Sequence, residues 1–300
     1  MASVKEIRIK IKSVKATQQI TKAMKMVAAA RMRKAQMAIL NSRPFAVQMD
    51  KVVEDLVKLE VLAEREAGRE VSIHPYFEDR GDAKECLILV TADKGLCGSF
   101  NANILRAAIA WIQARQGKKL MVAIVGRKGR DLINRLRDVQ LDRLVELVNV
   151  FPKIGFKHAE LLAEPVLAGF EKGEIDRVTV IYTEFKSAVS QVLIQKQLLP
   201  IPIPELKEGE SINSFGFHFE PSREDLLSVL LPRDIKAQLF RFLLESQAAE
   251  LAARMNAMDS ASKNAGELLD GLTLAMNRLR QGIITNELME IVGGAEALEA

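Results

Sequence analysis

Cysteine, histidine and aromatic residues are scarce in this chain of 300 residues. Two cysteines, Cys86 and Cys97, cannot build a disulfide-rich scaffold, and so few are typical of a reducing compartment. The three histidines, His74, His158 and His218, are too scattered to predict a zinc site. Aromatic residues make up only 5% of the chain, whereas methionine, alanine and leucine are frequent, and this composition favours helix.

Long hydrophobic runs are missing as well. The longest apolar stretches, such as residues 87–90 and 120–125, fall far short of the ~20 residues that span a bilayer, so no transmembrane helix is predicted. Apolar residues nevertheless reach 48% and charged residues 27%, which excludes a wholly disordered chain. The length fits one large domain or two modest ones.

The net charge of +4 is unevenly distributed. Residues 1–34 carry ten lysines and arginines against the single acid Glu6, so the rest of the chain has a net negative charge. A basic N-terminal segment is typical of a transit peptide, of an arm that binds nucleic acid or membrane, or of a helix that docks on an acidic protein. No apolar stretch follows the charges, which excludes a secretory signal. Since almost no aromatic residues interleave with the charges, stacking on nucleic-acid bases is not expected.

The N-terminal sixty residues predict one long helix. They contain no glycine, and apolar residues recur three and four positions apart from Val4 to Val14 and again from Ala28 to Ile39. The helix is expected to run from residue 4 to about residue 59. Ser42 and Pro44 either cap a second helix or kink the first one.

The C-terminal part predicts a second long helix, from residue 233 to about residue 295, because no proline follows Pro232. Twelve positions step alternately four and three apart, and all but Ser262 are apolar, which is the heptad pattern of a coiled coil. These positions are Leu244, Ala248, Leu251, Met255, Met258, Ser262, Ala265, Leu269, Leu272, Met276, Leu279 and Ile283. Gly266, Gly271 and Gly282 cost helix stability, so they are expected to allow close packing. We expect residues 2–58 to pair antiparallel with residues 233–297, as a rod that projects from a compact domain.

The middle of the chain alternates strand and helix signals. Apolar runs at residues 86–91, 120–125, 145–150, 178–185 and 189–199 predict strands, and residues 101–115, 128–137 and 158–170 predict helices. This alternation is typical of a doubly wound, largely parallel sheet, with the last two strands forming a hairpin at its edge. The predicted fold is therefore α/β: a Rossmann-like α/β domain at 85–214, with an N-terminal coiled-coil helix (1–60), a linker (61–84) and a C-terminal segment with a long coiled-coil helix (215–300).

Two glycine-containing turns of this domain raise the question of phosphate binding. Residues 94–98 and residues 125–130 each follow a predicted strand and precede a helix, where backbone amides can hold an anion. Their glycine spacing matches neither the dinucleotide fingerprint nor the Walker A loop, so a structural turn is the favoured interpretation of both. Cys97 is likewise interpreted as a buried thiol rather than a nucleophile.

Several sequence motifs resemble one known family. The motifs are Lys5-Glu6-Ile7-Arg8, residues 17–29 (TQQITKAMKMVAA), residues 93–98 (DKGLCG), Ala253-Arg254-Met255 with Ala257-Met258, and Arg280-Gln281 followed by Ile284-Thr285, Glu287-Leu288, Glu290-Ile291-Val292 and Gly294-Ala295. Together they resemble the gamma subunit of F-type ATP synthases over essentially the whole chain. The chain begins at the family's N-terminal motif and has no cysteine-paired insertion of the chloroplast type, which removes the transit-peptide interpretation and points to a bacterial protein.

The resemblance implies a non-catalytic rotor shaft. Its expected partners are the alpha and beta subunits of the catalytic hexamer, the epsilon subunit and the c-ring, and its expected place is the cytoplasmic face of the bacterial plasma (inner) membrane. No cofactor, metal or catalytic residue is implied. The resemblance places the rotor–stator contact at Met24, Lys25, Arg254, Arg280, Gln281, Thr285 and Glu287.

Two other classes of function remain as alternatives. One is a nucleotide- or phosphate-binding α/β enzyme that uses residues 94–98, with coiled-coil arms for dimerisation. The other is a coiled coil that binds nucleic acid through the basic N-terminus, which predicts DNA binding with a steep salt dependence.

Overall fold

The computed structural model describes residues 3–66, 68, 73–136, 139–151, 153–205 and 222–299, with side chains as far as Gly294. The chain forms two compact units, Met1–Ala29 with Arg254–Ala300, and Ala30–Ala253. This division falls inside the two long helices rather than at the expected boundaries 60/61 and 84/85, because each helix packs against different neighbours along its length. The expected boundary at 214/215 lies outside the described residues.

The two long helices extend further than the sequence predicts. Helix α1 spans Val4–Glu66 and continues through Pro44, so it reaches into the expected linker. Within it, Ser42 donates a hydrogen bond from its hydroxyl to the carbonyl of Ile39 and does not cap a second helix.

Helix α5 spans Arg223–Glu299, so its predicted start at residue 233 is wrong by ten residues. The hydroxyl of Ser222 accepts a hydrogen bond from the backbone N–H of Asp225, which caps the helix at its true start. Leu227 and Leu231 are fully buried in the core, and this packing offsets the hydrogen bond that is lost at Pro232 inside the helix.

Within the described residues, five strands and three helices form the α/β domain, which lies in the second unit. In chain order they are β1 (Lys84–Val90), α2 (Phe100–Gln113), β2 (Lys119–Val125), α3 (Arg127–Ile133), β3 (Leu141–Leu147), α4 (Phe156–Glu171), β4 (Arg177–Phe185) and β5 (Gln191–Leu199), and a short 3-10 helix, η1 (Pro75–Phe77), precedes them. The sheet order is β3-β2-β1-β4-β5, in which only β5 runs antiparallel to its neighbour. The predicted α/β fold with an edge hairpin is thus confirmed.

Two elements of this domain differ from their predicted bounds. Strand β3 begins at Leu141 rather than at residue 145, because it is an edge strand whose polar side chains give no continuous apolar run. Helix α3 ends at Ile133 rather than at residue 137, and residue 137 itself lies outside the described part of the chain.

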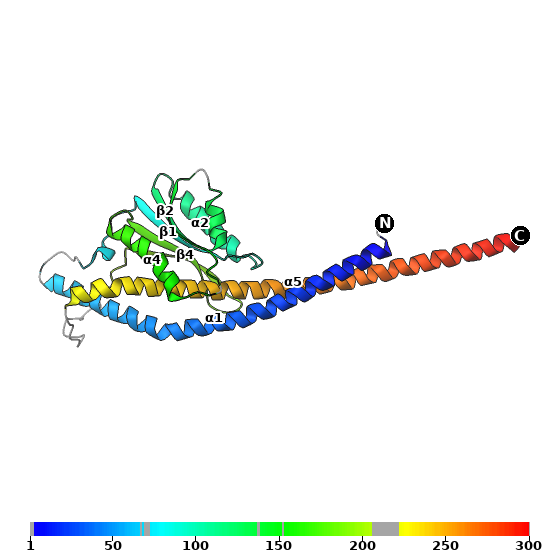
Figure 1. The fold of residues 1–300 in the computed structure, drawn as a ribbon, viewed down its shortest axis with the longest axis horizontal. Coiled ribbons are helices and arrows are strands. Elements are labelled where there is room, and N and C mark those ends of the chain that lie inside the picture. The colour runs from blue at the N-terminus through cyan, green and yellow to red at the C-terminus, as the bar shows by residue number, and fades with distance from the viewer. Residues whose placement is uncertain are drawn as a thin grey trace. The chain divides into compact units, whose positions relative to one another are not determined.

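The two faces of the sheet carry separate hydrophobic cores, since alternate residues of a strand point to opposite faces. Cys86, Ile88 and Val90 of β1 belong to the core that includes α4 and the neighbouring stretches of α1 and α5. Leu87 and Leu89 belong to the core formed with α2. Figure 1 shows α2 and α4 on opposite sides of the sheet, so every central strand is covered on both faces.

Among the residues that the structure describes, none of the helices has the length and apolarity needed to cross a membrane.

Candidate functional site

The turn after β1 is held together by the carboxylate of Asp93. Its Oδ1 accepts hydrogen bonds from the backbone N–H groups of Arg127 (3.0 Å) and Asn149 (2.8 Å), and its Oδ2 accepts one from Phe151 (3.3 Å). One buried side chain therefore joins the three turns that follow β1, β2 and β3. The arrangement favours a structural role for residues 93–98.

The turn at Gly126 is closed to an anion, because its backbone amides already have protein partners. The N–H groups of Gly126, Arg127, Lys128 and Gly129 bond to Leu147 O, Asp93 Oδ1, Ala92 O and the hydroxyl of Thr91. Gly126 has φ +93°, and a Cβ atom there would lie 2.1 Å from the carbonyl oxygen of Thr91. This N-terminus of α3 is packed against β1 and has no free donors for a phosphate.

Both cysteines are buried. Cys86 lies inside the sheet, where burial raises the pKa of its thiol to about 12. Cys97 is 1% exposed, and its Sγ accepts a hydrogen bond from the side-chain amide of Asn101. These environments agree with the interpretation of Cys97 as a structural thiol.

The first unit is an antiparallel pair formed by the start of α1 and the end of α5. Lys25 Nζ lies 2.6 Å from Asp259 Oδ1, and Gln18 Nε2 donates to the backbone oxygen of Ser262 at 3.4 Å, so rising numbers on one helix meet falling numbers on the other. Ile7, Ala28, Met258 and Ala265 are buried at the seam, as the heptad pattern predicts.

Of the three glycines that were expected to allow close helix packing, only Gly266 does so. A Cβ atom on Gly266 would lie 3.1 Å from Gln18 Nε2, whereas nothing lies within 4 Å of one on Gly271 or Gly282. The expectation was therefore wrong for Gly271, which lies on the exposed face of the helix pair, and for Gly282, which lies beyond the paired part of α5.

The end of α5 continues without a helical partner within this unit. The observed register places Val4 of α1 beside about residue 278 of α5. Every side chain from Gln281 to Gly294 is exposed, and Figure 1 shows α5 running past the N-terminal end of α1. Ile283, predicted as the last seam position, is 48% exposed because the seam ends before it.

The seven predicted contact residues all lie in the first unit, but in two groups. Met24, Lys25 and Arg254 are half-buried along the helix pair, and Arg280, Gln281, Thr285 and Glu287 are exposed on the unpaired end of α5. With ~1.5 Å of helix rise per residue, Arg254 and Arg280 are about 40 Å apart. The structure thus brings four of the residues together on the unpaired end of α5. The other three lie far from them, along the paired part of the two helices.

The electrostatic partner of Lys25 was missed from the sequence. Asp259 accepts hydrogen bonds from Lys25 and, one turn along α5, is bridged by Lys263 at 3.0 Å; these two interactions hold the pKa of Asp259 below its usual range. The apolar side chains of the α5 end were recognised in the sequence only as a seam position and as parts of the motif, not as contact residues. They are Ile283, Ile284, Leu288, Met289, Ile291 and Val292. Their signal in the sequence is an apolar pattern that continues after the paired helix has ended.

These features define a class of protein: an α/β domain in which the turn at Gly126 is closed to an anion, combined with terminal helices that pair antiparallel and leave one helix end unpaired. A family model described as ATP synthase matches residues 3–298. The chain belongs to the family of ATP synthase gamma chains.

Relatives of known name support this assignment along the full length. The chain is 46% identical to the ATP synthase gamma chain of Elusimicrobium minutum, with 99% of each chain covered, and 44% identical to that of an Anaeromyxobacter species, with 100% of each covered. Among solved structures it is similar to a chain of the Tetrahymena thermophila mitochondrial ATP synthase central stalk and c-ring, with 27% identity, a TM-score of 0.59, and 81% of this chain and 99% of that chain covered.

A second solved structure supports the fold alone. A chain of the Euglena gracilis mitochondrial ATP synthase has 20% identity and a TM-score of 0.63, with 98% of this chain and 94% of that chain covered. The chain is accordingly a non-catalytic subunit of ATP synthase that belongs to its central stalk.

Proposed function

We propose that this chain is the rotor shaft that couples proton flow through the membrane sector to conformational cycling of the catalytic beta subunits. The observation that carries the proposal is the unpaired end of α5, where residues 281–294 are exposed throughout and include six large apolar side chains. A lone apolar helix end needs a surrounding partner, because monomeric proteins rarely expose such a surface to water.

The polar residues of this helix end are suited to contacts that form and release. Arg280, Gln281, Thr285 and Glu287 lie within two helical turns, and the hydroxyl of Thr285 already donates to the carbonyl of Gln281. Contacts by such exposed groups each contribute only about 1–3 kcal/mol, so none of them holds the shaft at one angle. Because the shaft is asymmetric, each angle presents different groups to each beta subunit and thereby selects its conformation.

The proposed rotor–stator contact has a second part, away from the end of α5, which is formed by Met24, Lys25 and Arg254. Lys25 is tied to Asp259, which fixes its ammonium group on the surface of the helix pair, and Met24 beside it offers a flexible apolar contact. We place the alpha and beta subunits around both parts of this contact, the unpaired end of α5 and the helix pair at Lys25.

The proposal also covers the partners on the membrane side of the complex and the location of the chain in the cell. A solved relative is a central stalk with its c-ring, which supports the c-ring as a further partner, and the family resemblance adds the epsilon subunit. The two relatives compared by sequence, from Elusimicrobium minutum and an Anaeromyxobacter species, are bacterial, which supports a place on the cytoplasmic face of the plasma (inner) membrane.

The double substitution Gln281→Ala with Thr285→Ala tests the proposed contact at the unpaired end of α5. It should lower coupled ATP synthesis and catalytic turnover more than it lowers assembly of the complex, because it removes polar contacts from a helix that stays intact. The matched control is Asn264→Ala with Thr273→Ala, since Thr273 makes the same hydrogen bond to the carbonyl four residues earlier and Asn264 is an exposed amide on the same helix. Synthesis and hydrolysis at control rates in a fully assembled double variant would remove Gln281 and Thr285 from the contact.

A further inference from the structure

The stretch of α1 between Ala35 and Val53 is the longest part of this helix without a buried residue. Ala35 and Val53 themselves are buried, whereas each of residues 36–52 is exposed or half-buried. The stretch also contains Pro44, which removes one backbone hydrogen bond from the helix. Segments with few buried contacts open most readily, so a single polar contact can decide how firmly residues 36–52 are held.

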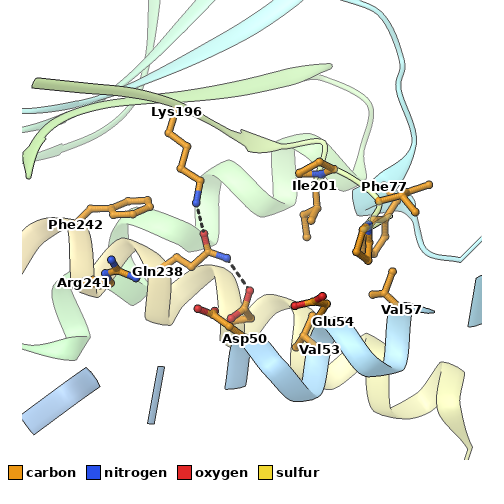
Figure 2. A pocket seen from close by; sticks show the side chains of 14 residues that line it. Asp50, Val53, Glu54, Val57, Phe77, Lys196, Ile201, Gln238, Arg241 and Phe242 are labelled. Carbon is orange, nitrogen blue, oxygen red and sulfur yellow. Dashed lines mark hydrogen bonds between the residues drawn. The ribbon is translucent and has the colours of Figure 1, made fainter. Parts of the chain in front are cut away.

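One such contact joins Asp50, near the end of this stretch, to Asp234 of α5. The two carboxyl groups are hydrogen-bonded to each other, and both residues lie within the second unit. They line a cavity of about 380 Å³ between α1, α5, β5 and the segment after β5. Figure 2 shows Asp50 on α1 beside Gln238 on α5. The pair is thus a direct polar contact between the two long helices.

The two carboxyl groups have different surroundings. Asp234 is only 4% exposed, and its Oδ2 accepts a hydrogen bond from Gln238 Nε2 at 2.8 Å, whereas Asp50 is exposed. An ionised carboxylate only accepts hydrogen bonds, so a hydrogen bond between two carboxyl groups requires that one of them holds a proton. Because burial disfavours the charged form, the proton belongs on Asp234, which donates to the carboxylate of Asp50.

Two cations face the pair, but each donates its hydrogen bond to another group. Lys196 of β5 attracts the buried carboxyl, and its Nζ donates to Gln238 at 3.5 Å. Arg241 of α5 attracts Asp50, and its Nε donates to Glu245 at 2.8 Å. Neither cation therefore takes the place of the shared proton.

Burial is the main reason that the pKa of Asp234 is raised to about 6. The hydrogen bond from Gln238 lowers this pKa, and the negative charge and the hydrogen bond of Asp50 raise it. The nearby acid on α1, Glu54, is neutralised by Lys58 at 2.8 Å. The carboxyl of Asp234 consequently loses its proton between about pH 5 and pH 7, and the two carboxylates then repel each other.

We propose that Asp50 and Asp234 form a pH-sensitive link between α1 and α5. While Asp234 is protonated, its hydrogen bond to Asp50 ties residues 36–52 of α1 to α5. When the proton is lost, the two negative charges repel, Asp50 turns toward water, and residues 36–52 open more often. The link uses none of the residues of the proposed rotor–stator contact and does not depend on the proposed function.

Hydrogen–deuterium exchange of the full chain tests this link. Peptides that cover residues 36–52 should exchange about tenfold more slowly at pH 5 than at pH 7.5, after correction for the intrinsic pH dependence of amide exchange. The factor follows from linkage, because the proton is held with a pKa of about 6 when the link is closed and with an ordinary pKa of about 4 when it is open.

Two variants separate the link from other effects of pH. Asp234→Asn gives Asp50 a permanent N–H donor, so residues 36–52 should exchange slowly at both pH values. Asp50→Ala, at an exposed position, removes the acceptor, so the same residues should exchange fast at both pH values. Asp142→Asn is the matched control, since it removes an exposed carboxylate on β3 and should keep the pH dependence of the unmodified chain.

A carboxyl-carbon NMR titration identifies the group that holds the proton. The resonance of Asp234 should titrate with a midpoint near pH 6, and Asp50→Ala should lower that midpoint because it removes the neighbouring negative charge. Equal exchange of residues 36–52 at pH 5 and pH 7.5 would overturn the proposal, since Asp50 would then turn away without any opening of α1. A pH dependence that persists in Asp234→Asn would overturn it as well.

Discussion

Substitution of Asp93 by alanine should destabilise the α/β domain strongly. The carboxylate is 8% exposed and accepts three backbone hydrogen bonds, from Arg127, Asn149 and Phe151. Alanine removes the acceptor of all three, and the turns after β1, β2 and β3 lose the side chain that joins them.

The expected loss follows from these three contacts. A hydrogen bond to a charged group contributes about 1.5–3 kcal/mol, but the bond from Phe151 is long at 3.3 Å, and the released N–H groups lie at the edge of the sheet, where water can reach them. We therefore expect Asp93→Ala to lower the free energy of unfolding by about 3–5 kcal/mol, a large part of the stability of an ordinary domain. Asp93→Asn should cost about 1–2 kcal/mol, because its amide oxygen retains the two bonds to Arg127 and Asn149.

Urea denaturation of the full chain measures this loss. Trp111 is the only tryptophan and lies in α2 of the same domain, so its fluorescence reports the unfolding directly. Asp142→Ala, at an exposed position of β3, provides a control with the same change of charge. If Asp93→Ala and Asp142→Ala had free energies of unfolding within about 1 kcal/mol of each other, the structural role of Asp93 would be wrong.

Two further predictions concern ionisable groups. The buried carboxyl of Asp234 has a pKa of about 6, so the folded chain is stabilised only while this carboxyl is protonated: the contribution is complete below about pH 4 and is lost as the pH rises through about 6. Asp234→Asn should therefore raise the free energy of unfolding at pH 8 by about 3 kcal/mol, which corresponds to a shift of two pKa units. At pH 4 the gain should be much smaller, and denaturation at both pH values measures the difference. An unchanged pH dependence would contradict this assignment. Lys25→Met should raise the pKa of Asp259 toward its ordinary value without reaching it, because Lys263 remains; a carboxyl-carbon NMR titration measures this, and no change would show that Lys25 does not contribute.

Periodicity in the sequence was sufficient to predict the main elements. The heptad positions from Leu251 to Ala265 are buried or half-buried as expected, and the central strands were recognised because both of their faces are covered and their apolar runs are continuous. The polar edge strand β3 gave a weaker signal, and its start was misplaced. The continuation of α5 through Pro232 depends on the burial of Leu227 and Leu231 in the core, which local sequence rules do not report.

The candidate site, like the fold, was predicted only in part from the sequence. Local motifs identified the positions Arg280, Gln281, Thr285 and Glu287 through resemblance, but only the structure shows that the partner helix has ended before most of them. The ion pair of Lys25 with Asp259 and the cavity around Asp234 join residues that are far apart in the sequence. Neither pattern has a local spacing, so neither could be predicted without the fold.

Rotation of this chain inside the assembled complex tests the central claim most directly. A single cysteine introduced at Val189, which is 86% exposed in the β4–β5 turn, provides a labelling site for a probe, while Cys86 and Cys97 are buried. With the beta subunits fixed to a surface and ATP supplied, the probe should turn in one direction and pause at three angles per revolution, one for each beta subunit. Continued ATP hydrolysis with a stationary probe would contradict the assignment of this chain as the rotor shaft.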